Sequence, residues 1–230
     1  MVDHIATETL TLALEAKTGI RQPQHAKTPP DNTPLAAETL RDYVGDYTTL
    51  AGFARIQNCG KRLCAEVADQ RFNLVRGNDG LFRLDYSLLG IFHIDLGSLG
   101  EIGFLRRTVD GRDLLVARAG TQEILAGQRI TLPAHLDAWK SRLGDYEIMN
   151  LDADQQFANR IRATGKQGYI FVEMTESAGN IMRIPLQPVS DTEALLLGPL
   201  NDGGETIRVV MMEGNERLLF SGYQLRKIER

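Results

Sequence analysis

The tripeptide Gly-Asp-Tyr occurs twice in this chain, at residues 45–47 and again 99 residues later at residues 144–146. Each copy precedes a series of short segments in which apolar and polar residues alternate, as they do along β-strands. Sequence similarity at a fixed spacing indicates a duplicated structural unit. The repeat therefore predicts two related all-β modules in tandem.

The similarity extends beyond the tripeptide at both ends of each module. Residues 40–47 (LRDYVGDY) align without gaps with residues 139–146 (WKSRLGDY). Near the far end of each module, an acidic residue and a glycine form the expected turn before an apolar strand, at residues 110–116 and 213–220. Two matching ends in the same order make a chance recurrence the weaker explanation. The structural repeat residues are Tyr43, Gly45, Asp46, Tyr47, Gly144, Asp145 and Tyr146.

Short turns separate the strands that the pattern predicts. Closely spaced strands with short turns are typical of an antiparallel meander or up-and-down barrel. The fold class is therefore predicted to be all-β, with two tandem antiparallel up-and-down β-barrels at residues 36–131 and 132–230. A short helix is expected before each barrel, at residues 35–43 and 136–142. The expected strands are 54–58, 62–67, 72–75, 81–86, 91–96, 102–107, 114–118, 123–125, 155–163, 169–175, 181–185, 194–197, 207–212, 218–221 and 224–228.

The N-terminal residues differ from the two modules. Residues 3–18 have a helical pattern, with Asp3 as a candidate N-cap and Gly19 as a C-terminal stop. Four of the eight prolines fall within residues 21–34, which predicts an extended linker rather than part of a sheet. We therefore assign residues 1–20 to a helix and residues 21–35 to a Pro-rich linker. A single helix of this size needs a partner for its apolar face, which suggests that it belongs to a domain upstream.

Charge and hydropathy exclude two classes of function. The net charge is −4 and no basic stripe carries interleaved aromatic residues, so the chain is not expected to bind nucleic acid. No apolar run approaches the length of a membrane span.

The two cysteines, Cys59 and Cys64, flank the turn of an expected hairpin. A disulfide across this hairpin needs a favourable register and Cβ geometry. Without a nearby histidine the pair does not make a zinc site, which needs three or four protein ligands. Two free thiols are the expected state, and we expect neither a metal nor a cofactor.

Candidates for catalysis or ligand binding are few. None of the six serines lies in a Ser-x-x-Lys or Gly-x-Ser-x-Gly motif. His93 and Asp95 share one face of the expected strand 91–96, which makes them candidate ligand-binding residues. A polar outer strand face is the commoner explanation of this pattern. For Asp46 and Asp145 we expect a local role at a turn, where an aspartate can bond backbone amides. The tyrosine after each aspartate is expected to pack against a barrel end.

The arrangement resembles the C-terminal part of β-lactamase-related serine hydrolases, a group with class C β-lactamases, D-aminopeptidases and penicillin-binding-protein-like esterases. Lipocalin-like barrels in this group often open with a leucine and then Tyr-x-Gly-x-Tyr, as Leu40 and residues 43–47 do here. In the second copy Arg142 replaces the first tyrosine. The resemblance identifies residues 1–20 with the last helix of a bacterial catalytic domain, and the duplication with the two barrels of D-aminopeptidase-type enzymes.

The family's Ser-x-x-Lys and Tyr-x-Asn motifs are absent from this chain. The resemblance therefore implies a non-catalytic accessory region that shapes substrate access or oligomerisation. Its partners would be the catalytic serine-hydrolase domain of the same parent chain and further copies of itself. The parent would be periplasmic or secreted.

Two alternatives remain open from the sequence. One is a self-standing lipocalin-like protein that binds small apolar ligands, because barrels of about eight strands can enclose one small ligand. Large side chains in the barrel interiors would contradict it, and the candidates are Phe82, Phe92, Tyr169, Phe171 and Phe220. The other is a free-standing enzyme that uses His93 and Asp95.

Overall fold

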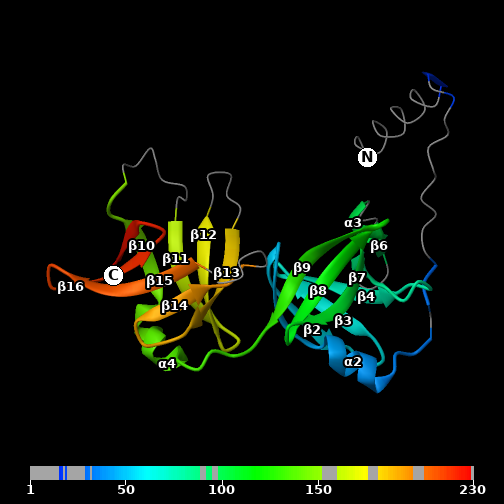
Figure 1. Cartoon of the computed structure of the whole chain (residues 1–230), viewed down its shortest axis with the longest axis horizontal. Coiled ribbons are helices and arrows are strands. Elements are labelled where there is room, and N and C mark those ends of the chain that lie inside the picture. The colour runs from blue at the N-terminus through cyan, green and yellow to red at the C-terminus, as the bar shows by residue number, and fades with distance from the viewer. Residues whose placement is uncertain are drawn as a thin grey trace.

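In a computed structural model, two β-barrels lie side by side along the long axis of the molecule (Figure 1). The structure describes residues 16–17, 19, 29–31, 33–88, 92–94, 98–151, 160–175, 181–198 and 205–228. Ala16 and Lys17 are helical, and the rest of the helix predicted at residues 3–18 lies outside the described residues. Within the described ranges, no helix has the length and apolar character needed to cross a membrane.

Barrel 1 comprises α2 (Ala37–Tyr43), β1 (Gly45–Thr49), β2 (Gly52–Asn58), β3 (Leu63–Val67), β4 (Gln70–Arg76), β5 (Phe82–Leu88), β6 (Phe92–Ile94), α3 (Ser98–Glu101), β7 (Gly103–Val109), β8 (Arg112–Ala119) and β9 (Gln122–Ile130). Barrel 2 comprises α4 (Leu136–Trp139), the 3-10 helix η1 (Lys140–Arg142), β10 (Gly144–Ile148), β11 (Arg160–Lys166), β12 (Tyr169–Thr175), β13 (Ile181–Pro188), β14 (Glu193–Leu196), β15 (Glu205–Met212), β16 (Asn215–Phe220) and β17 (Tyr223–Lys227).

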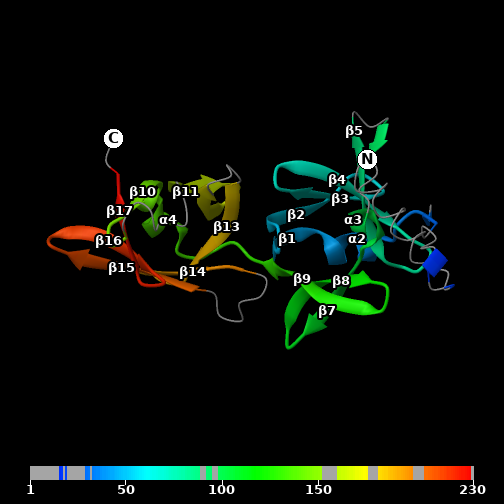
Figure 2. The ribbon, with the colours of Figure 1, turned by 90° about the horizontal axis from the view of Figure 1, so that it is seen from above.

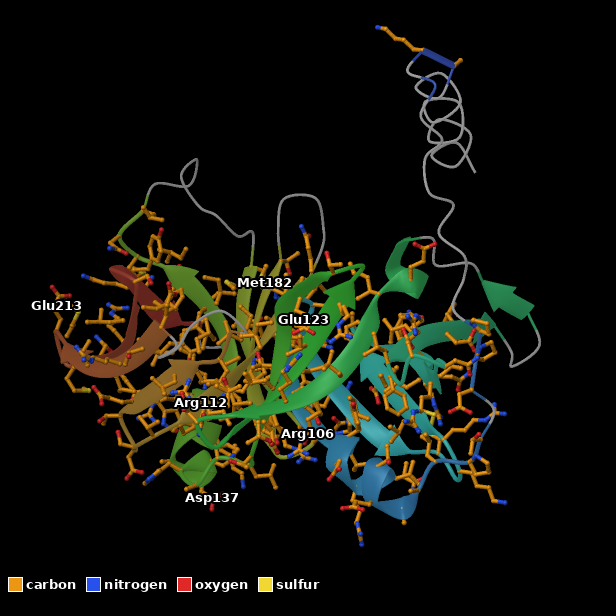
Figure 3. The ribbon with its side chains drawn as sticks, turned by 45° about the vertical axis from the view of Figure 1, so that its right-hand side comes forward. Arg106, Arg112, Glu123, Asp137, Met182 and Glu213 are labelled. Carbon is orange, nitrogen blue, oxygen red and sulfur yellow. A yellow bond between two sulfur atoms is a disulfide. The ribbon has the colours of Figure 1, made fainter. Side chains whose placement is uncertain are left out.

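Both barrels are closed antiparallel rings of eight strands, which confirms the predicted all-β fold. Barrel 1 closes where β1 pairs with β9, and barrel 2 closes where β10 pairs with β17. In barrel 1, the additional strand β6 pairs antiparallel with β5 and is not one of the eight strands of the ring. Helices α2 and α4 lie at the same end of their barrels, which is the lower end in Figure 1. Figure 3 shows Asp137 at that end and Glu213 at the tip of the β15–β16 hairpin, far from barrel 1.

The first strand of each barrel was not among the strands predicted. Gly-Asp-Tyr, placed at a turn by the sequence analysis, forms the beginning of β1 and of β10. Glycine and aspartate are depleted in strands, so local propensity argued against a strand here. Pairing on both sides, to β2 and β9 in barrel 1, overrides that preference.

The tyrosine of each repeat ties its strand to the short helical segment before it. Tyr47 is fully buried, and its hydroxyl donates a hydrogen bond of 2.8 Å to the carbonyl oxygen of Tyr43. Tyr146 is buried as well, and its hydroxyl donates a 2.6 Å bond to the carbonyl oxygen of Arg142. The same bond over four residues therefore fixes the entry of the chain into both barrels.

A basic residue of the last strand lies opposite each tyrosine. Tyr47 pairs with Arg129 of β9, and Tyr146 pairs with Lys227 of β17. Arg129 donates to the carbonyl oxygen of Val44, and the Lys227 ammonium donates to that of Ser141 at 2.6 Å. These cations cap carbonyl groups at the ends of the helical segments, where unpaired carbonyls carry partial negative charge.

The glycine of each repeat makes room for that cation. A Cβ on Gly45 would lie 2.6 Å from Nε of Arg129, and one on Gly144 would lie 2.9 Å from Cε of Lys227. Gly144 also has φ of +143°, which side chains rarely allow.

The aspartate of each repeat has a different role from the one predicted. Asp46 lies within a strand and accepts hydrogen bonds of 2.5 and 2.9 Å from Arg55 on β2. Asp145 accepts bonds from Arg160 on β11 and lies 3.6 Å from Arg162. Each carboxylate therefore joins the first strand of its barrel to the second by a charge-assisted hydrogen bond.

The end of the predicted Pro-rich linker contacts barrel 1 without forming one of its strands. Pro30 forms an isolated antiparallel bridge with Gly77. The amide of Asp31 donates to the carbonyl of Arg76 at 2.7 Å, and the amide of Asn78 donates to the carbonyl of Pro29 at 3.2 Å. The missing N–H of Pro30 is no obstacle, because both bonds use groups of its neighbours.

The two cysteines are not the free thiols that the sequence analysis expected. Cys59 and Cys64 form a disulfide, with their Cα atoms 6.0 Å apart. The amide of Cys59 donates to the carbonyl of Arg62 at 2.8 Å, which closes the turn between β2 and β3. The hairpin geometry thus brings the two side chains within bonding distance.

Each barrel has its own apolar core. In barrel 1 the buried cluster is Tyr47, Ala54, Ile56, Leu63, Ala65, Leu74, Phe82 and Leu115. In barrel 2 it is Trp139, Tyr146, Ile148, Ile161, Ile170, Leu186, Ala194, Leu196, Ile207, Leu218 and Leu225.

We expect Tyr146→Phe to lower the free energy of unfolding by about 1–2 kcal/mol, because the partly buried carbonyl of Arg142 loses its donor. Tyr86→Phe is the matched control, since the 3.3 Å hydrogen bond from the Tyr86 hydroxyl to Gln70 is exposed to solvent. Its effect should stay within about 0.5 kcal/mol. Urea unfolding followed by fluorescence measures both, and equal effects would contradict the role given to the Tyr146 hydroxyl.

Alkaline pH should destabilise the fold. Burial raises the pKa of Tyr47 and of Tyr146 to about 12. In the unfolded chain a tyrosine titrates near 10, so from about pH 10 to 12 the unfolded state loses the proton first. Stability is therefore complete below pH 10 and falls as the pH rises through this window. The slope of unfolding free energy against pH should be shallower in Tyr146→Phe than in wild type.

Candidate functional site

The two barrels contact each other through β2 of barrel 1 and β12 and β13 of barrel 2 (Figure 2). Phe53 on β2 lies 5.5 Å from the ring of Tyr169 and 5.1 Å from the ring of Phe171, measured between centroids. The Phe53–Phe171 pair is edge to face, a favoured arrangement of aromatic rings.

The aromatic residues of β12 belong to this contact and not to the barrel interior. Ile170 and Val172 line the interior of barrel 2, so the alternating Tyr169 and Phe171 point outward. Their exposed fractions are nevertheless only 3% and 1%. Outward-facing rings are buried to this degree because barrel 1 covers them.

Ion pairs surround the aromatic contact. Asp69, in the turn between β3 and β4, accepts hydrogen bonds from Lys166 at 3.1 Å and from Arg183 at 2.9 Å, both on barrel 2. Arg183 also donates to Glu173 at 2.8 Å. The bonds from Arg183 and then Lys166 lower the pKa of Asp69. These charges lie near the surface, so they fix the orientation of the barrels more than they stabilise the fold.

Backbone groups approach closely at the same contact. The Thr48 hydroxyl donates to the carbonyl oxygen of Leu197 at 3.0 Å. Gly52 has φ of +91°, and a Cβ there would lie 2.5 Å from the carbonyl oxygen of Arg183. Burial and then the charge of Asp46, in the repeat motif of barrel 1, raise the pKa of Tyr169 on barrel 2.

An inter-barrel groove of about 330 Å³ lies beside this contact. Its volume falls in the range of about 300–1,000 Å³ that is usual for small-molecule sites. Both barrels contribute apolar and charged side chains to it. The lining residues are Ala51, Phe53, Glu66, Ala68, Asp69, Lys166, Gln167, Phe171, Ile181 and Arg183.

The interior of barrel 2 is filled by side chains. Its cavity is about 30 Å³, and Trp139, Ile170 and Phe220 are among the residues that surround it. This space holds a water molecule or two but no organic ligand. In barrel 1, Phe82 is part of the buried core, as expected of a side chain that fills the interior.

Of the two predicted ligand-binding residues, the structure places only the backbone of His93. His93 lies on β6, where its backbone pairs with Ser87 of β5. Asp95 and the remainder of the predicted strand 91–96 lie outside the described residues. Within the described ranges, no three His, Cys, Asp or Glu side chains are placed to hold a metal ion.

The residues of the inter-barrel contact were missed in the sequence, although a signal was present. Residues 169–172 are apolar on both faces of the strand. A strand that is apolar on both faces is buried on both faces. The pattern therefore predicts that another part of the protein packs against the outer face of this strand. Asp69 and Arg183 carried no comparable signal, because an ion pair between turns and strands far apart in sequence leaves no local pattern.

We expect Phe53→Ala to lower the free energy of unfolding by about 2 kcal/mol, because its ring contacts two buried aromatic residues. The radius of gyration measured by small-angle scattering should also increase as the barrels separate. Leu50→Ala is the control, since Leu50 is 57% exposed in the neighbouring turn. A Phe53→Ala protein as stable and as compact as the Leu50→Ala protein would contradict the inter-barrel contact.

Comparison of the chain with protein-family models found no match, and comparison with curated protein sequences found none either.

Proposed function

We propose that this chain is a non-catalytic accessory region of a β-lactamase-related serine hydrolase. In this proposal it follows the catalytic domain of the same parent chain. There it shapes substrate access to the active site or holds an oligomer together. The proposal rests on the sequence resemblance together with the way in which the linker meets barrel 1.

The observation that carries the proposal is the attachment of the linker end. Two backbone hydrogen bonds hold Pro29 and Asp31 against Arg76 and Asn78. A domain N-terminal to residue 29 would therefore leave barrel 1 from a fixed point beside the β4–β5 turn. A fixed exit point supports a role in positioning the barrels against a neighbouring domain.

The inter-barrel contact supports the same proposal. Phe53, Tyr169 and Phe171 fix barrel 2 to barrel 1, and Asp69 adds two ion pairs. Two barrels joined in this way present residues of both to a neighbouring domain in a fixed arrangement. Such an arrangement can cover an active-site entrance or a neighbouring subunit.

A second candidate function is favoured by the inter-barrel groove. A self-standing protein that binds a small molecule would use this 330 Å³ space, because the 30 Å³ cavity inside barrel 2 is too small. The lining would suit a ligand with an apolar body, held against Phe53 and Phe171, and a polar end near Lys166 and Arg183.

The two functions predict different forms of the native protein. An antibody raised against residues 40–230 should capture, from the cells that make this protein, a species well above 25.6 kDa. Peptide mapping of that species should find a Ser-x-x-Lys motif upstream of residue 1. A native species of 25.6 kDa would overturn the accessory-region proposal and favour the small-molecule binder.

A further inference from the structure

The disulfide at the tip of the β2–β3 hairpin joins a half-buried cysteine to a buried one. Cys59 is half-buried and follows the last residue of β2. Cys64 is in β3 and is 5% exposed. A small thiol in solution can therefore approach Cys59 more easily than Cys64.

A guanidinium group lies against both sulfur atoms. Nη2 of Arg71, on β4, is 2.9 Å from Sγ of Cys59 and 3.6 Å from Sγ of Cys64. The side-chain oxygen of Asn73, a neutral group, is 3.9 Å from Sγ of Cys64. Glu66 is the cross-strand neighbour of Arg71, and Lys61 and Arg62 are exposed residues of the turn.

A cation so close to sulfur has little effect on a neutral disulfide but a large effect on a thiolate. Cysteine thiolates are stabilised by neighbouring lysine and arginine side chains, which increases their reactivity at neutral pH. When the reduced form of a disulfide is stabilised in this way, the disulfide becomes a stronger oxidant. Arg71 therefore favours reduction of this disulfide, which a purely structural crosslink does not require.

We propose that Cys59 and Cys64 form a thiol–disulfide exchange site for small thiols, in which Arg71 stabilises the thiolate that leaves in each step. In the first step a thiolate attacks Sγ of Cys59, a mixed disulfide forms, and Cys64 leaves as a thiolate. In the second step another thiolate attacks the mixed disulfide and releases Cys59 as a thiolate. Both leaving sulfurs lie within reach of Arg71.

The exchange balances without any further reactant. Two small thiols lose two electrons and become one disulfide, while the protein disulfide gains them and becomes two thiols. The two protons of the small thiols end on Cys59 and Cys64, or in solution while either remains a thiolate. The reaction is reversible, so the ratio of small thiol to its disulfide sets the state of the hairpin.

The test uses the full chain equilibrated with defined ratios of reduced to oxidised glutathione, quenched with acid, alkylated and weighed as an intact protein. Wild type should be reduced by millimolar glutathione and should show a species that carries one glutathione. Arg71→Gln should need a ratio roughly three- to fivefold higher for half reduction, the size expected of one partly exposed charge contact. At pH 7 its reduced form should also react with iodoacetamide more slowly by a similar factor.

Two further variants complete the test. Arg62→Gln removes the same charge from the same hairpin but leaves the backbone bond from Cys59 to Arg62 intact, and it should match wild type. Arg71→Lys keeps a positive charge and should recover most of the effect, which also controls for any structural damage in Arg71→Gln. A disulfide that resists millimolar glutathione, or equal values for Arg71→Gln and Arg62→Gln, would overturn the proposal.

Discussion

Closure of each ring is the constraint on which the rest of the structure depends. A sheet becomes a barrel without exposed edges only if its first strand pairs with its last strand. Here the first strand is short and begins with glycine and aspartate, which have low strand propensity, and side-chain hydrogen bonds hold it in place. Tyr47 and Tyr146 bond the chain before the strand, while Arg129 and Lys227 reach across from the last strand to the same segment. Both copies make the same two contacts, so closure is a property of the repeat.

The sequence allowed the architecture to be predicted because alternation and turns are local signals. It did not allow the role of Gly-Asp-Tyr to be predicted, because that role depends on residues of the last strand. Gly45 alone looks like a turn residue, and only the side chain of Arg129 beside it explains the missing Cβ. The ion pair of Asp46 with Arg55 follows from the register of two neighbouring strands. Register is set by the whole sheet and not by either segment.

The candidate site was less predictable than the fold for a similar reason. Aromatic residues in a strand can face the barrel interior or the outside, and only the register decides. Tyr169 and Phe171 face outward and bind the other barrel, whereas Phe220 faces inward. The interior of barrel 2 is therefore filled by side chains, and the groove between the barrels offers a larger space for recognition. The disulfide beside Arg71 lies on an outer hairpin and not in an enclosed pocket.

Ring closure also has a consequence for the order in which the chain folds. The partners Tyr47 and Arg129, like Tyr146 and Lys227, are about eighty residues apart, so neither ring can close before its last strand has left the ribosome. Contacts between residues so far apart in sequence form slowly. Barrel 1 is synthesised first and can close while barrel 2 is still being made. The strands of the two barrels therefore become available for pairing at different times. This order reduces the chance that a strand of one barrel pairs in the place of the corresponding strand of the other.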